Sequence, residues 1–201
     1  MGIVILSMTM GSFTNIMGQD AIRFTETYKS NEVIGLLDKE DAFFSMMNTE
    51  NVDPEASRLG ICPDSESDAI WKHLHSKEVR KRLPKDLRFA WGWESEAGNR
   101  TLFALRDSQK AGPEQEDLKS VSIQESKREG NYDLLLTFSK QGADSWARMT
   151  RENVGRNIAI VLDGKVLAAP LVRMEIRQGK CQISGNFSKA EAMEIKTLIE
   201  N

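Results

Sequence analysis

Residues 157–172 read NIAIVLDGKVLAAPLV, two apolar runs on either side of an Asp-Gly pair. Asp163-Gly164 suits the positive backbone angles of a two-residue turn, so the stretch predicts a hairpin of two strands. Pro170 lacks a backbone N–H and is acceptable where a strand lies at an edge or is bulged. A carboxylate in such a turn could be a catalytic acid or a calcium ligand, but no His, Cys or second acid accompanies Asp163 at a motif spacing. We therefore interpret Asp163 and Gly164 as structural residues.

The sequence on both sides of this hairpin mixes strand and helix patterns. Apolar alternation or short apolar runs predict strands at 22–28, 87–93, 101–107, 118–126, 132–139 and 180–187. Helical spacing predicts helices over 31–47, 67–82 and 140–154 and after Ser188, with Ser30, Ser139 and Ser188 as N-caps and Glu191 at capping-box distance. Residues 48–68 are polar and contain Pro54, Gly60 and Pro63, so they are expected to form a loop. Because hairpins dominate, the expected fold is α+β, with mainly antiparallel sheets and packed helices.

The composition is that of an ordinary globular protein. Of the 201 residues 40% are hydrophobic and 28% charged, and the formal net charge is −3. This balance gives no reason to expect a nucleic-acid partner, because such proteins usually present a strongly basic surface. No stretch contains the roughly 18 consecutive apolar residues that a membrane-spanning helix needs.

The first 19 residues differ from the rest. They carry no charged side chain, and an apolar run at 3–10 is followed by small and polar residues, as in a secretory leader. We expect an exported, periplasmic or otherwise extracytoplasmic protein; the alternative is a cytoplasmic protein whose residues 3–6 form a first strand. A Gly- and Pro-containing connector at 108–117 divides the remainder into an N-terminal α+β half at 20–110 and a C-terminal α+β half at 111–201.

Residues that could carry catalysis or metal binding are few. His73 and His75 are two apart on a predicted helix, whereas helical metal-binding pairs are four apart, so exposed or capping roles are favoured. Cys62 and Cys181 do not form a metal-binding spacing and could be paired or free. The basic run at 77–85 is typical of a solvated helix end. Without a recognisable catalytic, phosphate-binding or metal motif, we expect no enzyme, no cofactor and no metal.

Two stretches are candidate binding surfaces. Trp91 and Trp93 share one face if 87–93 is a strand, while Ala90 and Gly92 leave the reverse face nearly bare. That bare face could admit another backbone or an apolar partner, although buried tryptophans are more common. The strand around Ala169-Pro170 is the second candidate, because its proline marks an edge.

The stretch 136–195, LTFSKQGADSWARMTRENVGRNIAIVLDGKVLAAPLVRMEIRQGKCQISGNFSKAEAMEI, resembles a known family. It is similar to the periplasmic P1 head region of SecD and SecDF, the membrane accessory proteins of the Sec translocon. The residues that carry the resemblance are Phe138, Gly142, Ala143, Trp146, Asn153, Gly155, Ala159 to Asp163, Ala169-Pro170, Ile176, Gly179, Ile183, Gly185, Phe187, Glu191 and Ala192. Segments upstream, FTETYKSNEV, LPKDLRFAWG and TLFALRD, also resemble parts of SecDF, so the similarity extends over most of the chain from Ile22.

The resemblance implies a SecDF P1 head-like fold in which Gly185, like Asp163 and Gly164, belongs to a structural motif. It also implies a non-catalytic head that contacts preprotein. SecD and SecDF couple proton flow through transmembrane bundles, and this sequence contains no such segments. The expected function is therefore an exported protein- or peptide-binding module, without proton-coupled translocase activity of its own and possibly close to the membrane.

Several alternatives stay open. An envelope regulatory or sensor domain that binds a small ligand would show a closed apolar pocket with a few convergent polar groups. An enzyme with an unfamiliar site would show clustered acids with perturbed pKa values in a cleft. The sequence does not determine the oligomeric state or the identity of the partner.

Overall fold

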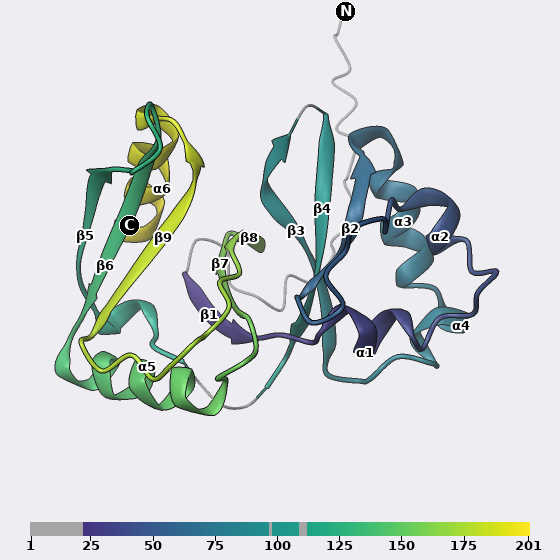
Figure 1. The fold of residues 1–201 in the computed structure, drawn as a ribbon, viewed down its shortest axis with the longest axis horizontal. Helices are drawn as coiled ribbons and strands as arrows, with labels where there is room; N and C mark the ends of the chain where they lie inside the picture. Colours follow the sequence, from purple (N-terminus) through teal and green to yellow (C-terminus); the bar gives the residue numbers. More distant parts are fainter. Residues whose placement is uncertain (1–21, 97, 109–111) are drawn as a thin grey trace, which may run out of the picture.

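The structure of the protein, a computed structural model, describes residues 22–96, 98–108 and 112–201 and contains two β-sheets (Figure 1). The larger sheet has the order β1-β7-β8-β3-β4-β2 and the smaller has the order β5-β6-β9. The strands are β1 (Arg23–Glu26), β2 (Arg58–Pro63), β3 (Leu87–Glu96), β4 (Asn99–Arg106), β5 (Leu118–Glu125), β6 (Tyr132–Phe138), β7 (Ile158–Leu162), β8 (Lys165–Ala168) and β9 (Lys180–Phe187). The helices are α1 (Ser30–Ile34), α2 (Phe43–Met46), α3 (Ser67–Leu74), α4 (Lys77–Arg80), α5 (Lys140–Glu152) and α6 (Lys189–Glu200), with short 3₁₀ turns η1 (Asp64–Glu66) and η2 (Gln115–Asp117). The strands pair antiparallel except for β3 with β8, so the predicted α+β class is confirmed.

The β7–β8 hairpin occupies the middle of the larger sheet. Asp163 and Gly164 have φ of 48° and 72°, the positive angles expected of a tight two-residue turn. Strand β8 ends at Ala168, before the proline, and the Pro170 carbonyl accepts a hydrogen bond from Ile158 N at 3.2 Å. Pro170 therefore lies beyond the strand ladder, where its missing N–H leaves no gap in the pairing.

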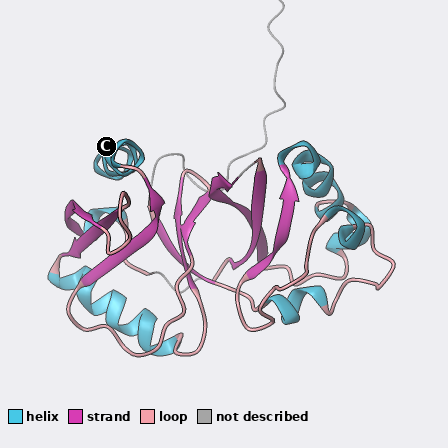
Figure 2. Ribbon diagram, turned by 45° about the horizontal axis from the view of Figure 1, so that its top comes forward, coloured by secondary structure: helices cyan, strands magenta, loops and turns pink. Residues whose placement is uncertain are grey.

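The larger sheet curves strongly (Figure 2), so that the chain just after its edge strand β1 reaches β4. Thr27, just after β1, pairs with Leu105 of β4, and Tyr28 N donates to Ala104 O at 3.1 Å. The curved strands enclose an inner cluster of small or medium side chains: Ala90, Leu105, Ala159, Val161 and Val166. Small inward-facing residues permit this tight curvature, because larger side chains would hold the strands apart.

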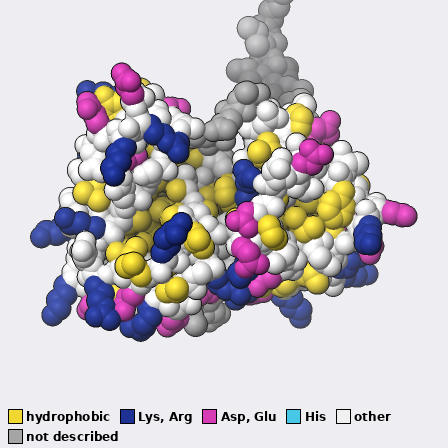
Figure 3. All heavy atoms as spheres, viewed as in Figure 1, with side chains coloured by type: hydrophobic (Ala, Val, Ile, Leu, Met, Phe, Trp, Pro, Cys, Tyr) yellow, Lys and Arg dark blue, Asp and Glu magenta, His cyan; other side chains and the backbone are white. Residues whose placement is uncertain are grey.

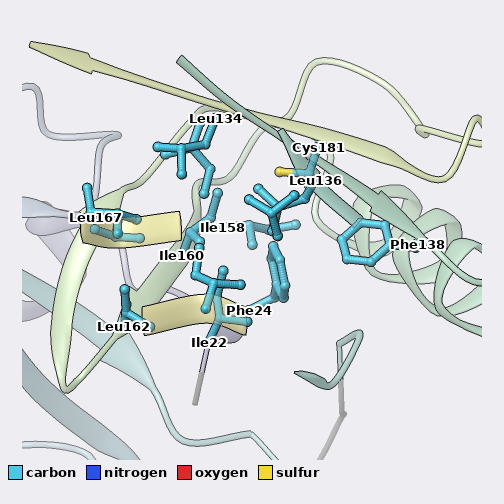
Figure 4. Close-up of a cluster of buried hydrophobic side chains, with 14 of the residues drawn as sticks. Ile22, Phe24, Leu134, Leu136, Phe138, Ile158, Ile160, Leu162, Leu167 and Cys181 are labelled. Carbon is cyan, nitrogen blue, oxygen red and sulfur yellow. The ribbon is translucent and has the colours of Figure 1, made fainter. Parts of the chain in front are cut away.

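Two further cores cover the outer face of this sheet. The helix-side core packs α1 to α4 against β2, β3 and β4. The sheet-side core packs β5, β6, β9, α5 and α6 against β1, β7 and β8, and Figure 4 shows Leu134, Leu136 and Phe138 of β6 gathered with Ile158 and Ile160 of β7. Because alternate residues of β7 enter the inner cluster and the sheet-side core, the whole strand is buried, which explains its unbroken apolar sequence.

The predicted C-terminal elements are confirmed. Strands β5 and β6 form a hairpin, and α5 begins after Ser139, whose hydroxyl accepts a hydrogen bond from Gly142 N. The capping box before α6 is also present. Ser188 N donates to the Glu191 carboxylate at 2.8 Å, and Glu191 N donates to the Ser188 hydroxyl at 3.3 Å.

The single helix predicted over 31–47 is wrong, because the chain forms two short helices, α1 and α2, with a turn between them. Asp41 determines where the second helix, α2, begins. Its carboxylate accepts hydrogen bonds from Phe43 N at 2.9 Å and from His73 Nε2 at 2.5 Å, so it satisfies the backbone of a new helix instead of continuing the first.

Two other boundaries are also wrong. The predicted loop at 48–68 contains β2, whose Leu59 and Cys62 are buried and which pairs with β4 and with Asn48. The predicted helix at 67–82 is interrupted at Ser76, which has extended backbone angles and accepts a hydrogen bond from Val79 N to start α4. Pairing with the distant strand β4 determines β2, and the N-cap Ser76 determines the break between α3 and α4.

The predicted domain boundaries stay predictions. The leader at 1–19 lies outside the described residues, as do residues 109–111, where the halves 20–110 and 111–201 were expected to meet. The larger sheet takes β1 to β4 from the first half and β7 and β8 from the second. The larger sheet therefore requires strands from both halves.

An ion pair joins α1 to the segment before β7, and we predict that it makes stability depend on pH. The Glu32 carboxylate accepts hydrogen bonds from Arg156 Nη1 and Nη2 at 3.1 and 2.9 Å. The Arg156 guanidinium lowers the pKa of Glu32 below its ordinary 4.5, so the pair stabilises the fold above that pH and is lost as the pH falls through the lowered value.

We expect Glu32→Gln to reduce the free energy of unfolding by about 1 kcal/mol at pH 7 and by less as the pH falls below 4.5, measured by urea titration. Glu194→Gln, at an exposed position of α6, is the control. A difference between wild type and Glu32→Gln that stays constant from pH 7 to pH 3 would contradict the prediction.

Candidate functional site

The two candidate tryptophans lie on β3 and contact different parts of the molecule. Trp91 packs against the helix-side core, with its ring 6.2 Å from that of Trp71. Trp93 packs against the sheet-side core, and Lys165 Nζ lies 5.4 Å from its ring centroid. Both rings are half-buried, so the structure gives them packing contacts, and a binding role for them stays a prediction.

The reverse face of β3 is covered, contrary to the expectation of a bare face. Ala90 belongs to the inner cluster and is buried, and Gly92 pairs with Val166 of β8. The backbone that approaches this part of β3 therefore belongs to the chain itself. Because neither Ala90 nor Gly92 has a large side chain, the sheet can curve at this position.

The segment that follows β8 presents the second candidate pair at the surface. Ala169 is half-buried and Pro170 is exposed, and Asn157 Nδ2 donates to the Ala169 carbonyl at 2.6 Å. Beyond them, Leu171 and Met174 have exposed fractions of 48% and 70%. These two apolar side chains follow the proline on a segment fixed by backbone hydrogen bonds.

A third exposed apolar residue, Val154 at the end of α5, lies beside this segment. Val154 is 53% exposed, and its neighbour Gly155 donates its N–H to the Val172 carbonyl at 2.9 Å. We call Val154, Leu171 and Met174 the apolar shelf. They are three of the five large apolar side chains that are exposed in the described ranges, and backbone hydrogen bonds between 155–157 and 170–172 pair the two segments on which they lie.

The chain after the shelf runs back along α5 and forms a groove with it. Ile176 N donates to the Thr150 hydroxyl at 2.9 Å, and Gly179 lies so close to Ala143 that an added Cβ would be 2.8 Å from the Ala143 Cβ. Between the helix and this segment is a hollow of about 810 Å³, here called the α5 groove. Its charged lining residues are Lys140, Asp144, Arg148, Arg151, Glu175 and Arg177.

The charge of the α5 groove is positive overall. Glu175 is engaged by Arg177 at 2.8 Å and by Arg151 at 3.5 Å, and the hydrogen bond from Arg177 lowers the pKa of Glu175. Figure 3 shows dark blue basic side chains, with magenta acidic ones among them, along the lower left edge of the molecule, where α5 lies in Figure 1, and yellow apolar side chains above them. Apolar and basic surfaces therefore adjoin.

A second hollow lies at one end of the curved sheet, where β1 and β4 come together. Its volume is about 400 Å³, and its lining includes Arg23, Arg88 and Arg106 together with Asp107 and acidic residues near η2. Arg88 is paired with Asp107 at 2.7 Å. Ile22, Phe24, Leu105 and Val161 also line this hollow, so apolar and charged side chains are mixed in it.

The titratable candidates of the sequence have structural contacts. His73 pairs with the buried carboxylate of Asp41, and His75 stacks on Trp71 with ring centroids 4.4 Å apart. Cys62 and Cys181 are free and buried in different cores, and burial raises the pKa of Cys181 to about 12. Among the residues that the structure describes, no group of three or more His, Cys, Asp or Glu side chains is placed to hold a metal ion.

Gly185 lies in a stretch of β9 where the register against β6 shifts. A Cβ added there would be 2.6 Å from two ring atoms of Phe187, a fully buried residue. Glycine thus lets the Phe187 ring fold over the backbone of its own strand. The structural roles assigned to Asp163, Gly164 and Gly185 agree with their positions in turns and close contacts and stay predictions.

The sequence predicts Ala169 and Pro170 as candidates, which stay predictions, and does not indicate the apolar shelf. Val154 and Leu171 fit the patterns of a helix and a strand, and Met174 has no pattern around it. An apolar residue between charged neighbours outside any periodic segment, as in Arg173-Met174-Glu175, is the one signal that could have indicated an exposed contact.

A family model described as SecDF, P1 head subdomain, matches residues 99–201, which is slightly more than half of the chain. The chain belongs to the SecDF P1 head family. The match begins at β4 and extends to the end of α6, so the family segment contains the apolar shelf and the α5 groove, whereas Trp91 and Trp93 precede it.

Individual relatives match shorter stretches of the chain. The chain is 40% identical over 72 residues to protein translocase subunit SecDF of Thermus thermophilus, covering 36% of this chain and 10% of that protein. It is 36% identical over 84 residues to protein translocase subunit SecD of Leptotrichia buccalis, covering 42% of this chain and 20% of that protein. The chain thus spans a fifth or less of the length of these SecD and SecDF relatives.

Solved structures of SecDF are similar at low identity. A crystal structure of SecDF in its super-membrane-facing form aligns with 90% of this chain and 19% of its own, at a TM-score of 0.48 and 23% identity. A second structure, of the membrane component SecDF that enhances protein export, aligns with 89% of this chain and 61% of its own, at a TM-score of 0.44 and 22% identity. In the residues of the present chain that the structure describes, no helix is long and apolar enough to cross a membrane.

Proposed function

We propose that this chain is a non-catalytic, extracytoplasmic module that binds an extended segment of another protein and has no proton-coupled translocase activity of its own. Its relatives are protein translocase subunits, which handle other polypeptides. The observation that carries the proposal is the apolar shelf, because three exposed apolar side chains on two paired segments favour contact with an apolar partner.

The physical basis of binding is the burial of the shelf. A fully buried Val, Leu or Met side chain contributes about 1.5–3 kcal/mol, and the shelf residues are already partly covered, so each gains less on binding. Losses of translational freedom and chain entropy oppose this gain. We therefore expect micromolar affinity, which suits a surface that holds and releases different sequences.

The proposal predicts that polar substitutions on the shelf weaken binding. The probe is a reduced, unfolded, fluorescein-labelled polypeptide, and the readout is fluorescence anisotropy with the purified chain. Leu171→Ser combined with Met174→Ser should raise the Kd at least about tenfold, because both side chains lose their apolar contact with the peptide.

Leu36→Ser is the matched control for this experiment, since Leu36 is 41% exposed on the loop after α1 and lies outside the shelf. Its Kd should equal that of the wild type. Binding that is lost with Trp91→Ala and Trp93→Ala but unchanged in the shelf variant would move the site to β3. Absence of saturable binding by the folded wild type at high micromolar concentration would refute the proposal.

The extracytoplasmic location rests on the predicted leader and on the family. Fractionation of cells that express the chain with a C-terminal tag tests it. The chain should be found outside the cytoplasm and shortened near residues 19 and 20, and deletion of residues 2–19 should keep it in the cytoplasm. A full-length chain found in the cytoplasm would contradict this part of the proposal.

A further inference from the structure

The apolar shelf and the α5 groove are neighbours in the chain, because Met174 directly precedes Glu175, which lines the groove. The shelf lies at the C-terminal end of α5, and the segment 172–179 leads from it along the helix to Gly179 beside Ala143, in the first turn. Helix α5 has 13 residues and is thus roughly 20 Å long. An extended peptide rises about 3.3 Å per residue, so roughly six residues would lie along the groove.

Basic side chains outnumber acidic ones along this surface. The groove is lined by four basic side chains and two acidic ones, and the acidic Glu175 is already engaged by Arg151 and Arg177. Arg173, between two shelf residues, is exposed as well. The groove is therefore positive although the chain has a net charge of −3, so its field differs in sign from that of the molecule as a whole.

We infer that the α5 groove selects peptide segments in which acidic residues adjoin an apolar pair, the apolar pair contacting the shelf and the acidic residues lying along α5. This inference rests on the proposed function and specifies its ligand. Opposite charges across an interface favour encounter and exclude like-charged partners, and the attraction weakens with added salt.

The shape of the surface favours a peptide over a lipid bilayer. The basic side chains line an open depression between α5 and residues 175–177, along which an extended chain can lie. Concave surfaces with apolar and charged subsites are typical of peptide recognition.

Three labelled peptides test the inference. All three begin with the same apolar pair; four acidic residues follow it in the first peptide, four serines in the second and four lysines in the third. A second set has the four residues before the apolar pair, so that both directions of binding are tested. We expect the acidic peptide to bind roughly tenfold more tightly than the serine peptide and the lysine peptide to bind most weakly. Raising NaCl from 50 to 500 mM should remove most of this difference.

The double variant Lys140→Glu, Arg177→Glu tests whether the α5 groove is the site that selects acidic peptides. Lys140 begins α5, where an acidic residue suits the helix dipole, and the Arg177 side chain is 80% exposed, so the variant should fold normally. It should bind the acidic peptide roughly tenfold more weakly and the serine peptide as the wild type does. Lys39→Glu with Lys85→Glu changes the net charge equally at exposed positions outside the groove and should have little effect.

The outcomes separate this inference from the proposed function. Loss of the acidic preference only in the groove variant supports the inference. Equal binding of all three peptides, or an acidic preference that persists in the groove variant, overturns it and leaves the proposed function intact. If none of the peptides bind while vesicles with anionic lipid do, the proposed function itself fails and the surface is a membrane contact.

Discussion

Trp146→Ala should lower the free energy of unfolding by about 3–5 kcal/mol, the largest single effect that we expect. Trp146 is 2% exposed, and its ring lies 5.2 Å from that of Phe24 on β1 and 5.9 Å from that of Phe138 on β6. These three rings join α5 to both sheets, so truncation leaves a cavity that neither sheet can close alone. Urea unfolding followed by circular dichroism measures the loss.

Trp146→Phe is the matched control. It keeps an aromatic ring in the cluster and removes the indole N–H, which is buried without a hydrogen-bond partner among the described residues. An unpaired buried donor lowers stability, so this variant should lose less than about 1.5 kcal/mol. If Trp146→Ala and Trp146→Phe lose the same amount, the ring packing described here is not what stabilises the protein.

Gly142→Ala should destabilise the protein by about 1–3 kcal/mol, although alanine is the better helix former by about 1 kcal/mol. Gly142 lies in the first turn of α5, where a Cβ would be 2.7 Å from the Asp117 Cβ and 3.1 Å from the Asp117 carbonyl oxygen. Asp117 belongs to η2, and its carbonyl also accepts a hydrogen bond from Ser139 N at 2.7 Å, so it cannot move without disturbing the start of the helix.

Gln141→Ala provides the comparison, because Gln141 is the preceding helix residue and is exposed. Its unfolding free energy should equal or slightly exceed that of the wild type, since only helix propensity changes. A Gly142→Ala variant that is as stable as Gln141→Ala would show that η2 does not pack tightly against α5. Urea titrations of both variants measure this difference directly.

The sequence predicted best those elements whose signals are local. Asp163-Gly164 indicated a tight turn, Ser139 indicated the start of α5, and Ser188 with Glu191 indicated the capping box of α6. Each signal depends on backbone geometry or hydrogen bonds within a few residues, so it can be read without knowledge of the fold.

Elements that depend on distant partners were missed. Strand β2 is a short apolar run that contains Gly60 and lies within a polar stretch, and it forms because β4 and Asn48 pair with it. The break between α1 and α2 depends on the carboxylate of Asp41, which pairs with His73 of another helix. Such contacts join residues far apart in sequence, so no local pattern reports them.

The candidate site likewise contains residues that the sequence indicated and residues that only the structure reveals. The proline after the β7–β8 hairpin, together with the family resemblance carried by 136–195, directed attention to Ala169 and Pro170 from the sequence alone. The apolar shelf required the tertiary structure, because hydrogen bonds between 155–157 and 170–172 pair the segment that carries Val154 with the one that carries Leu171 and Met174. Local sequence determines where strands turn and helices begin, whereas exposure of a side chain depends on which distant segments cover it, and only the folded chain decides that.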